Sequence, residues 1–464
     1  MRPTLHSAYT SCEEFQSSKI NEKMTTNEEK VKDLDAGALF VLKSEGSWIH
    51  CGYHLTTSIV APALLSLPFA LASLGWVLGL LCLTIGALVT FYSYNLLSLV
   101  LEHHAQQGQR HLRFRDMAHH ILGPRWARYF VGPIQFAVCY GAVVGCTLLG
   151  GQSMKSIYLI NHPNGGMKLF EFVMIFGCLM LVLAQVPSFH ALRHINLVSL
   201  ILALGYSACA TAGSIHVGNS SDAHKDYSLN GDTASRMFAG FNAMAIIATT
   251  YGNGIIPEIQ ATLAPPVKGK MFKGLLVCYS VVFVTFFSVA ISGYWAFGNK
   301  AGGTILANFF VDGKALVPKW LLVLSNLFAL LQVSAVGVVY LQPTNEVLER
   351  KFGDAMSAEF SPRNVIPRLI LRSISVALAT LLAAMLPFFG DINALIGAFG
   401  FIPLDFVLPV VFYNTTFAPS KKSFLFWGNT TIALVFSAVG LIGAVSAVRQ
   451  IYLDADNYRL FANV

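Results

Sequence analysis

A run of 56 residues, from Gly46 to Leu101, contains no Asp, Glu, Lys or Arg. A helix needs about 20 predominantly apolar residues to cross a bilayer, so this run alone predicts two spans joined by a tight turn. The rest of the chain agrees, because only 12% of its 464 residues are charged, against roughly 25% in soluble domains. This composition excludes the soluble and disordered classes and indicates a helical membrane protein with many spans.

Charged residues separate the other apolar runs of the chain. Together with the first run, they predict an all-α integral membrane protein with about 11 transmembrane helices. The predicted helices are 48–73, 76–101, 129–158, 169–188, 194–217, 236–262, 273–297, 319–344, 367–387, 390–413 and 423–449.

Lysine and arginine indicate the orientation of these helices. With the amino terminus inside, 22 of the 31 basic residues lie in cytosolic segments, as the positive-inside rule requires. This predicts a cytosolic tail over residues 1–46, a transmembrane domain over 47–449 and an extracellular tail over 450–464. The tail 1–46 has no apolar region typical of a signal peptide. The sequon at Asn219 then lies in the external loop 218–235 and is predicted to be glycosylated.

Two of the predicted spans are interrupted near their centres. Pro62 and Pro68 lie in the first, and Gly252, Gly254 and Pro257 lie in the sixth. Proline removes a backbone donor and clashes with the preceding turn of a helix. One such proline usually makes only a kink, but two interrupted helices five spans apart predict two five-helix inverted repeats.

The repeats are predicted at about 48–217 and 236–413, with an extra helix at about 423–449. Freed backbone at membrane depth is tolerated where it lines a cavity or is buried in protein. The amino ends of half-helices can hold a carboxylate, and unwound carbonyls can hold an ammonium group. The two breaks therefore predict a site for a small zwitterion.

Several segments resemble a known family. Residues 65–70 (LSLPFA), 74–76 (LGW) and 257–263 (PEIQATL) are similar to the amino acid/auxin permease family, which has the leucine-transporter-like inverted-repeat fold. Residues 114–123 (FRDMAHHILG), 131–135 (VGPIQ) and 403–409 (PLDFVLP) are most like its plant γ-aminobutyrate (GABA) transporter branch. The resemblance runs from about residue 36 to the end. One departure is the first break, where many family members have glycines and this chain has Ala61-Pro62-Ala63.

The resemblance implies a secondary active transporter that imports GABA and related zwitterions with protons across the plasma membrane. Alternatives are a proline/betaine or broad neutral amino acid permease, and a non-transporting amino acid sensor on the same fold. The expected partners are a small zwitterion and the lipid bilayer. Nucleic acid is not expected, since the basic residues form no stripe with interleaved aromatics. No enzyme motif is present in the sequence, so the chain is predicted not to be an enzyme, and to need no cofactor apart from protons as the coupling ion.

The substrate is expected to contact the two breaks. Tyr140 in the third predicted span is added through the resemblance, because that span usually borders the site in such proteins; core packing is the alternative. The candidate substrate-binding residues are Val60, Ala61, Pro62, Ala63, Leu64, Tyr140, Ile247, Thr249, Thr250, Tyr251 and Gly252.

Three ionisable residues within spans are candidates for proton coupling or gating. Glu258 lies roughly 13 Å and Asp405 roughly 5 Å from the centre of their spans, at about 1.5 Å per residue, and His54 lies near the depth of Glu258. Such residues are expensive in a membrane and are functional candidates by default. For each of the two acids the alternative is a structural hydrogen bond, and for His54 it is simple packing. We expect Asp405 either to bind the distant ammonium group of GABA or to carry the coupling proton.

The histidines and cysteines are not expected to bind metal. The pairs 103–104 and 119–120 are adjacent in sequence, and neighbours on a helix point about 100° apart, so each pair is interpreted as part of a solvated loop. Seven of the eight cysteines fall inside apolar segments without CxxC spacing. They are interpreted as small core residues rather than disulfides or metal ligands.

Overall fold

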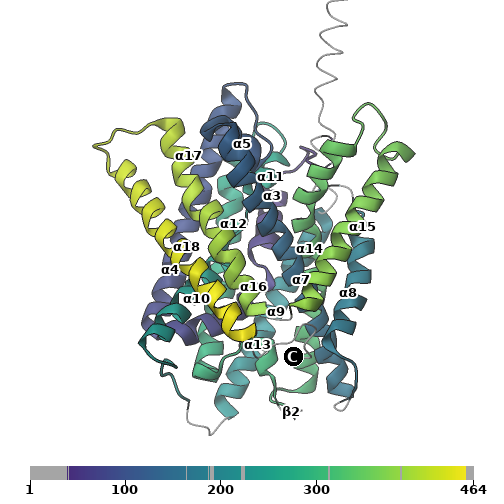
Figure 1. The fold of residues 1–464 in the computed structure, drawn as a ribbon, viewed down its shortest axis with the longest axis vertical. Coiled ribbons are helices and arrows are strands. Elements are labelled where there is room, and N and C mark those ends of the chain that lie inside the picture. Colours follow the sequence, from purple (N-terminus) through teal and green to yellow (C-terminus); the bar gives the residue numbers. More distant parts are fainter. Residues whose placement is uncertain are drawn as a thin grey trace, which may run out of the picture.

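The computed structural model describes residue 39 and residues 41–162, 165–186, 188, 193–220, 225–311, 314–386 and 389–455. Helices dominate these residues, as the sequence predicted, and they run mostly along one direction (Figure 1). The longer helices are α3 (Trp48–Ile59), α4 (Leu67–Gln106), α5 (Phe114–Leu122), α7 (Gly132–Asn161), α8 (Leu169–Leu183), α9 (Arg193–Ser220), α10 (Thr233–Tyr251), α12 (Lys270–Phe297), α14 (Lys319–Phe352), α15 (Pro362–Met385), α17 (Leu408–Phe417) and α18 (Phe424–Ala455).

Short helical pieces and one hairpin complete the described structure. Strands β1 and β2 pair antiparallel, with Phe310 opposite Ala315. The short pieces are η1 (Pro62–Ser66), α6 (Pro124–Trp126), η2 (Ala127–Val131), α11 (Ile256–Ala261), η4 (Gly298–Lys300), α13 (Ile305–Asn308), β1 (Phe310–Val311), β2 (Lys314–Ala315), α16 (Phe389–Ile396) and the π-helical η5 (Gly397–Val407).

Figure 1 shows α5 and α11 at one end of the molecule and α13 with β2 at the other, and we call these the α5 end and the α13 end. The first break separates α3 from η1, and the second separates α10 from α11. Helix α4 bends at Gly75, whose φ of 75° and ψ of 174° are not helical. The first predicted turn, between helices 48–73 and 76–101, falls at this glycine.

Eight helical segments in the described part of the chain are long and apolar enough to cross a membrane. The first of them, Trp48–Gln106, has 59 residues, more than twice the length that one crossing needs. Helices α8 and α10 are not among the eight. The count of 11 spans therefore stays a prediction, as do the repeat boundaries. The tails predicted at 1–46 and 450–464 lie largely outside the described residues.

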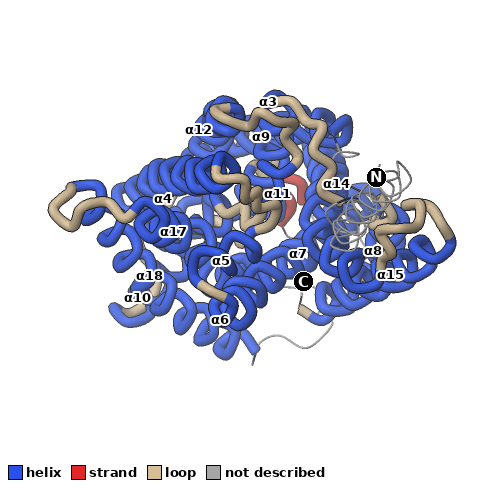
Figure 2. The backbone as a smooth tube through the Cα atoms, turned by 90° about the horizontal axis from the view of Figure 1, so that it is seen from above, coloured by secondary structure: helices blue, strands red, loops and turns tan. Residues whose placement is uncertain are grey.

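The core is formed by helices that are distant in sequence. Helix α7 packs along α14, α3 packs against α12 and α9, and α10 packs against α4. Viewed from above, α11 lies among the longer helices rather than at the rim (Figure 2). The residues at both breaks are buried, with Val60 and Asn253 both 0% exposed, which is the environment that interrupted backbone requires at membrane depth.

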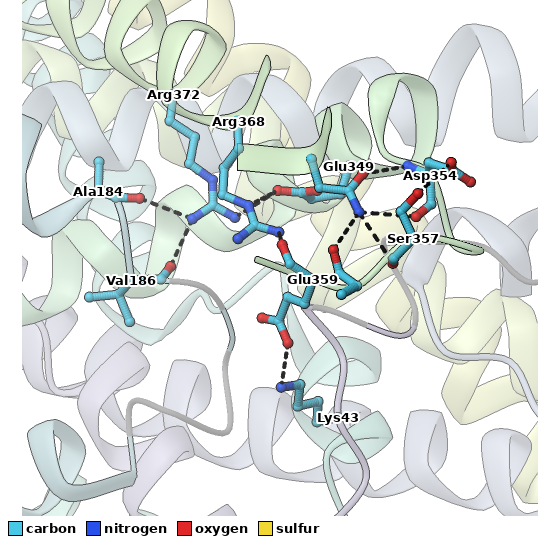
Figure 3. A network of polar contacts seen from close by, with 11 residues as sticks. Lys43, Ala184, Val186, Glu349, Asp354, Ser357, Glu359, Arg368 and Arg372 are labelled. Carbon is cyan, nitrogen blue, oxygen red and sulfur yellow. Dashed lines mark hydrogen bonds and ion pairs between the residues drawn. The ribbon is translucent and has the colours of Figure 1, made fainter. Parts of the chain in front are cut away.

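Buried ion pairs hold the end of α14 against α15 and α8. Arg368 Nε donates to Glu349 Oε1 at 2.6 Å, and Arg372 Nη2 donates to the same oxygen at 3.2 Å. Arg372 Nη1 also donates to the carbonyls of Ala184 and Val186, which follow α8 (Figure 3). One carboxylate thus holds two arginines, and backbone oxygens accept from Nη1 of Arg372. Such pairing and hydrogen bonding is how a buried charge is tolerated.

More ion pairs lie at the same end of the molecule. Lys43 Nζ lies 2.9 Å from Glu359 Oε2 (Figure 3). Arg115 Nη2 donates to both carboxylate oxygens of Glu346, at 2.7 and 2.8 Å, and Arg113 pairs with the same carboxylate. These contacts join the segments before α3, at the start of α5 and at the end of α14, so they close the α5 end.

Candidate substrate site

The first break opens where α3 ends at Ile59. Val60 leaves the helix with φ −79° and ψ 58°, and η1 begins at Pro62 after the extended Ala61. Proline suits the first position of a helix, because the N–H that it lacks has no partner there. The proline that ends the first half-helix therefore also starts the second.

Neutral side chains from other helices satisfy the carbonyls at the end of α3. The Val60 carbonyl accepts from Tyr206 Oη at 3.4 Å and from Gln332 Nε2 at 3.3 Å. The Ser58 carbonyl accepts from Tyr340 Oη at 3.2 Å. These donors come from α9 and α14, so the open end of α3 is stabilised without any charged group.

The amino end of η1 supplies donors to the space beside it. The first N–H groups of a helix have no partner within the helix and carry a partial positive charge. Ala61 and Ala63 both line a cavity at this point. A carboxylate in that cavity would therefore meet backbone N–H groups at the amino end of a helix, which is a favourable anion site.

The second break opens where α10 ends at Tyr251, and a carboxylate stabilises it. Asp405, fully buried on η5, accepts from the backbone N–H of Asn253 at 3.0 Å and of Gly254 at 3.1 and 3.2 Å. Gly254 has a φ of 63°, a conformation that glycine adopts without steric cost. Charge-assisted hydrogen bonds of this kind are about twice as strong as neutral ones.

Glu258 belongs to the other end of the same break. It is buried on α11 and accepts from Gln135 Nε2 at 2.7 Å and from the backbone N–H of Phe114 at 3.1 Å. Gln135 Nε2 also donates to the Gly254 carbonyl at 3.0 Å. Glu258 thus connects the second broken helix to α7 and α5 rather than to the cavity.

One hydrogen bond joins the two breaks directly. Asn253 Nδ2 donates to Ser58 Oγ at 2.8 Å, and both residues are buried. The bond links the residue after α10 to the last turn of α3. Rearrangement of either break therefore affects the other.

A cavity of about 50 Å³ lies between the breaks. None of the described side chains that line it carries a formal charge, and many are small or apolar. They are Ser58, Ala61, Pro62, Ala63, Ala142, Gly145, Cys146, Leu149, Thr249, Gly252, Val333, Val336, Tyr340, Phe389, Asn393, Ile396 and Phe401. Partial charges of helix ends and neutral polar groups are therefore what this cavity offers to a charged ligand.

Asn393 is the lining residue with an unused donor. It is 5% exposed, and its Nδ2 atom has no hydrogen-bond partner in the structure. Its backbone carbonyl is occupied, because it accepts from Thr249 Oγ1 at 2.5 Å. A buried amide without a hydrogen-bond partner raises the free energy of the folded protein. A ligand group that accepts a hydrogen bond from Asn393 would remove this penalty.

A second cavity, of about 230 Å³, continues toward the α13 end. Leu149 of α7 lines both cavities, and Lys155, Asn326 and Phe310 line the outer one. The ion pairs therefore lie at the α5 end, while the second cavity lies on the side of the first that is nearer the α13 end.

The structure brings some of the predicted substrate residues to the cavity. Ala61, Pro62, Ala63, Thr249 and Gly252 line it. The other five are buried but do not line it, and they are Val60, Leu64, Ile247, Thr250 and Tyr251. Ile247 lines a different cavity, beside Phe406 and Phe436.

Tyr140 is a correction to the sequence prediction. Its hydroxyl donates to the Ser375 carbonyl of α15 at 2.8 Å, so it does not face the cavity. The same helix contributes Ala142 and Gly145 instead. Residues two and five positions further along a helix point about 200° and 140° away from the first, which explains the error.

The three ionisable candidates do not line this cavity either. His54 is 2% exposed within α3. Both oxygens of Asp405 accept from backbone N–H groups, and Glu258 is held by Gln135. Direct contact of Asp405 with a substrate ammonium group therefore gains no support from the geometry, while the coupling roles stay predictions.

Sequence reasoning missed the lining residues of α14, α16 and η5. Val333, Val336 and Tyr340 lie within an apolar run that looks like ordinary core. Asn393 had a usable signal, because it is a polar residue in the apolar stretch 392–404. A polar side chain in a membrane span needs a partner or a function.

Two broken helices around a central uncharged cavity, closed at one end by ion pairs, define a helical membrane transporter. A family model described as transmembrane amino acid transporter protein matches residues 44–453. The chain belongs to this family of amino acid transporters, and it is a multi-pass membrane protein. The family and the relatives below are transporters rather than enzymes, as the sequence predicted.

Relatives and solved structures support this assignment. GABA transporter 1 of Arabidopsis thaliana is 66% identical over 434 residues, which cover 93% of this chain and 96% of that protein. Lysine histidine transporter-like 1 of the same plant is 29% identical and covers 94% of each chain. The crystal structure of MhsT in complex with L-phenylalanine has a TM-score of 0.56 at 10% identity, covering 87% of this chain and 99% of MhsT. The latter similarity shows the fold, a leucine-transporter-like one, as predicted.

Proposed function

We propose that this protein imports GABA, together with protons, across the plasma membrane. The observation that carries the proposal is the cavity between the two breaks, whose small lining residues and helix ends suit a short flexible zwitterion. The name of the relative that is 66% identical, GABA transporter 1, supports GABA as the substrate. Proton coupling rests on the family resemblance and on the buried acids near the breaks, Glu258 and Asp405.

The two ends of the ligand have different partners in this proposal. The carboxylate lies at the amino end of η1, near the N–H groups of Ala61 and Ala63, where Asn393 adds a donor. The ammonium group lies toward the carboxyl end of α10, near Thr249 and Gly252, where helix carbonyls carry partial negative charge. The three methylenes of GABA pack between them against the apolar lining.

Uptake of radiolabelled GABA into a transport-deficient host tests the proposal. A potential of about 100 mV contributes roughly 2.3 kcal/mol per charge, so one proton with a neutral zwitterion concentrates GABA about fifty-fold before any pH gradient acts. We expect accumulation above the external concentration, its loss with a protonophore, and no change when sodium is replaced by choline. A sodium requirement would contradict proton coupling, and equilibration without accumulation would contradict active transport.

A competition panel tests the choice of substrate. Unlabelled GABA should inhibit labelled uptake at lower concentration than proline, glycine betaine or larger neutral amino acids. The physical reason is that the added bulk of each competitor meets the walls formed by Ala63, Gly145 and Phe401. This bulk is the ring of proline, the trimethylammonium group of betaine, or the side chain on the α-carbon of a larger amino acid. Stronger competition by proline or betaine would favour the neighbouring transporter class instead.

The membrane orientation belongs to the same proposal. The amino terminus and the α5 end face the cytosol, the α13 end faces outward, and Asn219 in the last turn of α9 is glycosylated. Removal of N-glycans should shift the mobility of the wild type but not of Asn219→Gln. Cleavage of a carboxyl-terminal epitope by external protease on intact cells supports the orientation, and protection of that epitope contradicts it.

A further inference from the structure

Three histidines that are scattered in sequence meet at the α5 end. His104 lies near the end of α4, His111 lies in the segment before α5, and His120 lies on α5. Their ring centroids form a near-equilateral triangle with sides of 5.1, 4.8 and 5.0 Å. Each ring offers one nitrogen, and these three atoms lie within 4.8 Å of one another.

The nitrogens in this cluster lack other partners. His104 is 6% exposed, and neither of its ring nitrogens has a hydrogen-bond partner among the described residues; Nε2 of His111 is buried and has none there either. Buried polar atoms of native proteins are normally paired. Here two imidazoles with unpaired nitrogens lie beside a third. A metal ion, which accepts the lone pairs of such nitrogens, is the ligand that this arrangement indicates.

The two arginines near the cluster in sequence are bonded to groups outside it. Arg110 donates to the Ala261 and Leu263 carbonyls of the neighbouring segment, and Arg113 pairs with Asp116 and Glu346. Both arginines are therefore directed to other partners.

We propose that His104, His111 and His120 form a zinc site. Three imidazoles with an open fourth position for water are a known arrangement of tetrahedral Zn²⁺. At a Zn–N distance of about 2.1 Å the nitrogens are about 3.4 Å apart, so the triangle must contract slightly. The ring of His120 is exposed and free to rotate inward. His103 does not fill the fourth position through Nε2, which is bonded to Gln107 at 3.0 Å.

The bound ion would connect three segments of the chain. It fixes the segment before α5 and α5 itself to the end of α4. The backbone N–H of Phe114, the first residue of α5, donates to Glu258 of the second broken helix. Metal occupancy therefore stiffens the wall against which that half-helix rests. The site lies apart from the central cavity, so it does not depend on which amino acid is transported.

Zinc titration of the purified full-length protein tests the site. The protein carries an affinity tag without histidines, is first treated with a chelator, and then competes with a chromophoric zinc chelator. We expect one zinc per chain in the wild type. His120→Gln should weaken binding at least about tenfold, the loss typical of disturbed metal shells, and because this residue is exposed the variant should fold.

Two further variants decide between a specific site and adventitious binding. His119→Gln is the matched control, since His119 is exposed on α5 beside His120 but is outside the cluster; it should bind zinc like the wild type. The double variant His104→Gln/His111→Gln should bind none, and cobalt should give the visible absorption of a tetrahedral complex only in proteins with the intact cluster. Absence of zinc from the wild type would overturn the proposal, and so would equal binding by His120→Gln or an equal loss in His119→Gln.

Discussion

The two broken helices differ in the side chains that pair with their freed backbone groups. At the first break, hydroxyl and amide donors from α9 and α14 satisfy the carbonyls of Ser58 and Val60. At the second break, the carboxylate of Asp405 satisfies the N–H groups of Asn253 and Gly254. One break is therefore stabilised by neutral groups at its carbonyl side, and the other by a charge at its N–H side.

This difference indicates which backbone groups of each break, the N–H groups or the carbonyls, remain available to bind a ligand. Backbone groups buried away from water are normally paired, so those already used by the protein are not offered to the substrate. At the first break Ala61 and Ala63 line the cavity, whereas at the second break the N–H groups of Asn253 and Gly254 are bonded to Asp405. The carbonyls of Tyr251 and Gly254 at the second break are also paired, with Tyr94 and Gln135. The contrast therefore favours the first break for the carboxylate of a zwitterion and does not by itself assign its ammonium group.

The largest effect on uptake is expected at the second break, which the carboxylate of Asp405 stabilises. Asp405→Asn replaces one accepting oxygen by a donor that faces the N–H of Asn253 or Gly254. Losing charge-assisted bonds worth about 1.5–3 kcal/mol each should reduce the ratio of maximal rate to KM for GABA uptake at least about a hundredfold. Asp391→Asn, in the same predicted span, should have a small effect. Normal uptake by a properly expressed Asp405→Asn protein would show that the carboxylate does not hold this break.

The neutral break should be sensitive to bulk rather than to charge. Ala63→Leu places three additional carbon atoms at the wall where the carboxylate is proposed to bind. We expect the KM for GABA to rise at least about tenfold while surface expression stays normal, because a ligand must then give up contacts worth about 1–3 kcal/mol. The control is Ala438→Leu, which adds the same bulk to an exposed position of α18. Equal uptake by Ala63→Leu and the wild type would place the site elsewhere.

Adding a single methyl group to the cavity wall distinguishes an effect on substrate binding from an effect on folding. A Cβ at Gly145 would lie 3.7 Å from Phe389, an ordinary contact, whereas a Cβ at Gly252 would lie 2.2 Å from the Phe401 ring. Gly145→Ala should therefore fold and raise the KM about fivefold, by roughly 1 kcal/mol. Gly252→Ala should reduce the amount of folded protein, measured by size-exclusion chromatography, and Gly428→Ala should change neither quantity. An unchanged KM in Gly145→Ala would remove this wall from the substrate site.

The smallest effect on uptake is expected when one neutral hydrogen-bond donor at the first break is removed. Tyr340→Phe removes the hydroxyl that donates to the Ser58 carbonyl at 3.2 Å. A neutral hydrogen bond contributes about 0.7 kcal/mol net, so uptake should fall about threefold. Uptake by Tyr206→Phe should fall less, because the bond from Tyr206 to the Val60 carbonyl is longer, at 3.4 Å. If either variant lost activity to the extent expected of Asp405→Asn, the contrast between a neutral and a charged break would be wrong.

Local chemistry allowed the positions of both breaks to be predicted. Pro62 cannot continue a helix, and Gly252 and Gly254 lower helix propensity wherever they occur. The structure has its interruptions at these residues, between α3 and η1 and between α10 and α11. The membrane class and the transporter family were also predictable, because long uncharged runs and short motifs are properties of neighbouring residues in the chain.

The wall of the cavity was predictable only in part. The family resemblance added Tyr140 to the candidate site, with core packing as the alternative, and its hydroxyl bonds to the Ser375 carbonyl on α15. Each helical residue turns by about 100°, so the side of α7 that faces the cavity depends on how the helix is rotated in the bundle. That rotation results from packing against α14 and α8, which a single sequence does not encode locally.

The sequence by itself determined that the chain spans a membrane, that two of its helices are broken, and that residues 44–453 belong to an amino acid transporter family. Only the tertiary structure decided what stabilises those breaks. Asp405 meets Asn253 across 152 positions, and Tyr340 meets Ser58 across 282. The three histidines of the proposed zinc site likewise meet only when α5 folds back on α4. Such contacts depend on the packing of whole helices, because hydrogen bonds and metal ligands require positions within about 1 Å that local propensities do not specify.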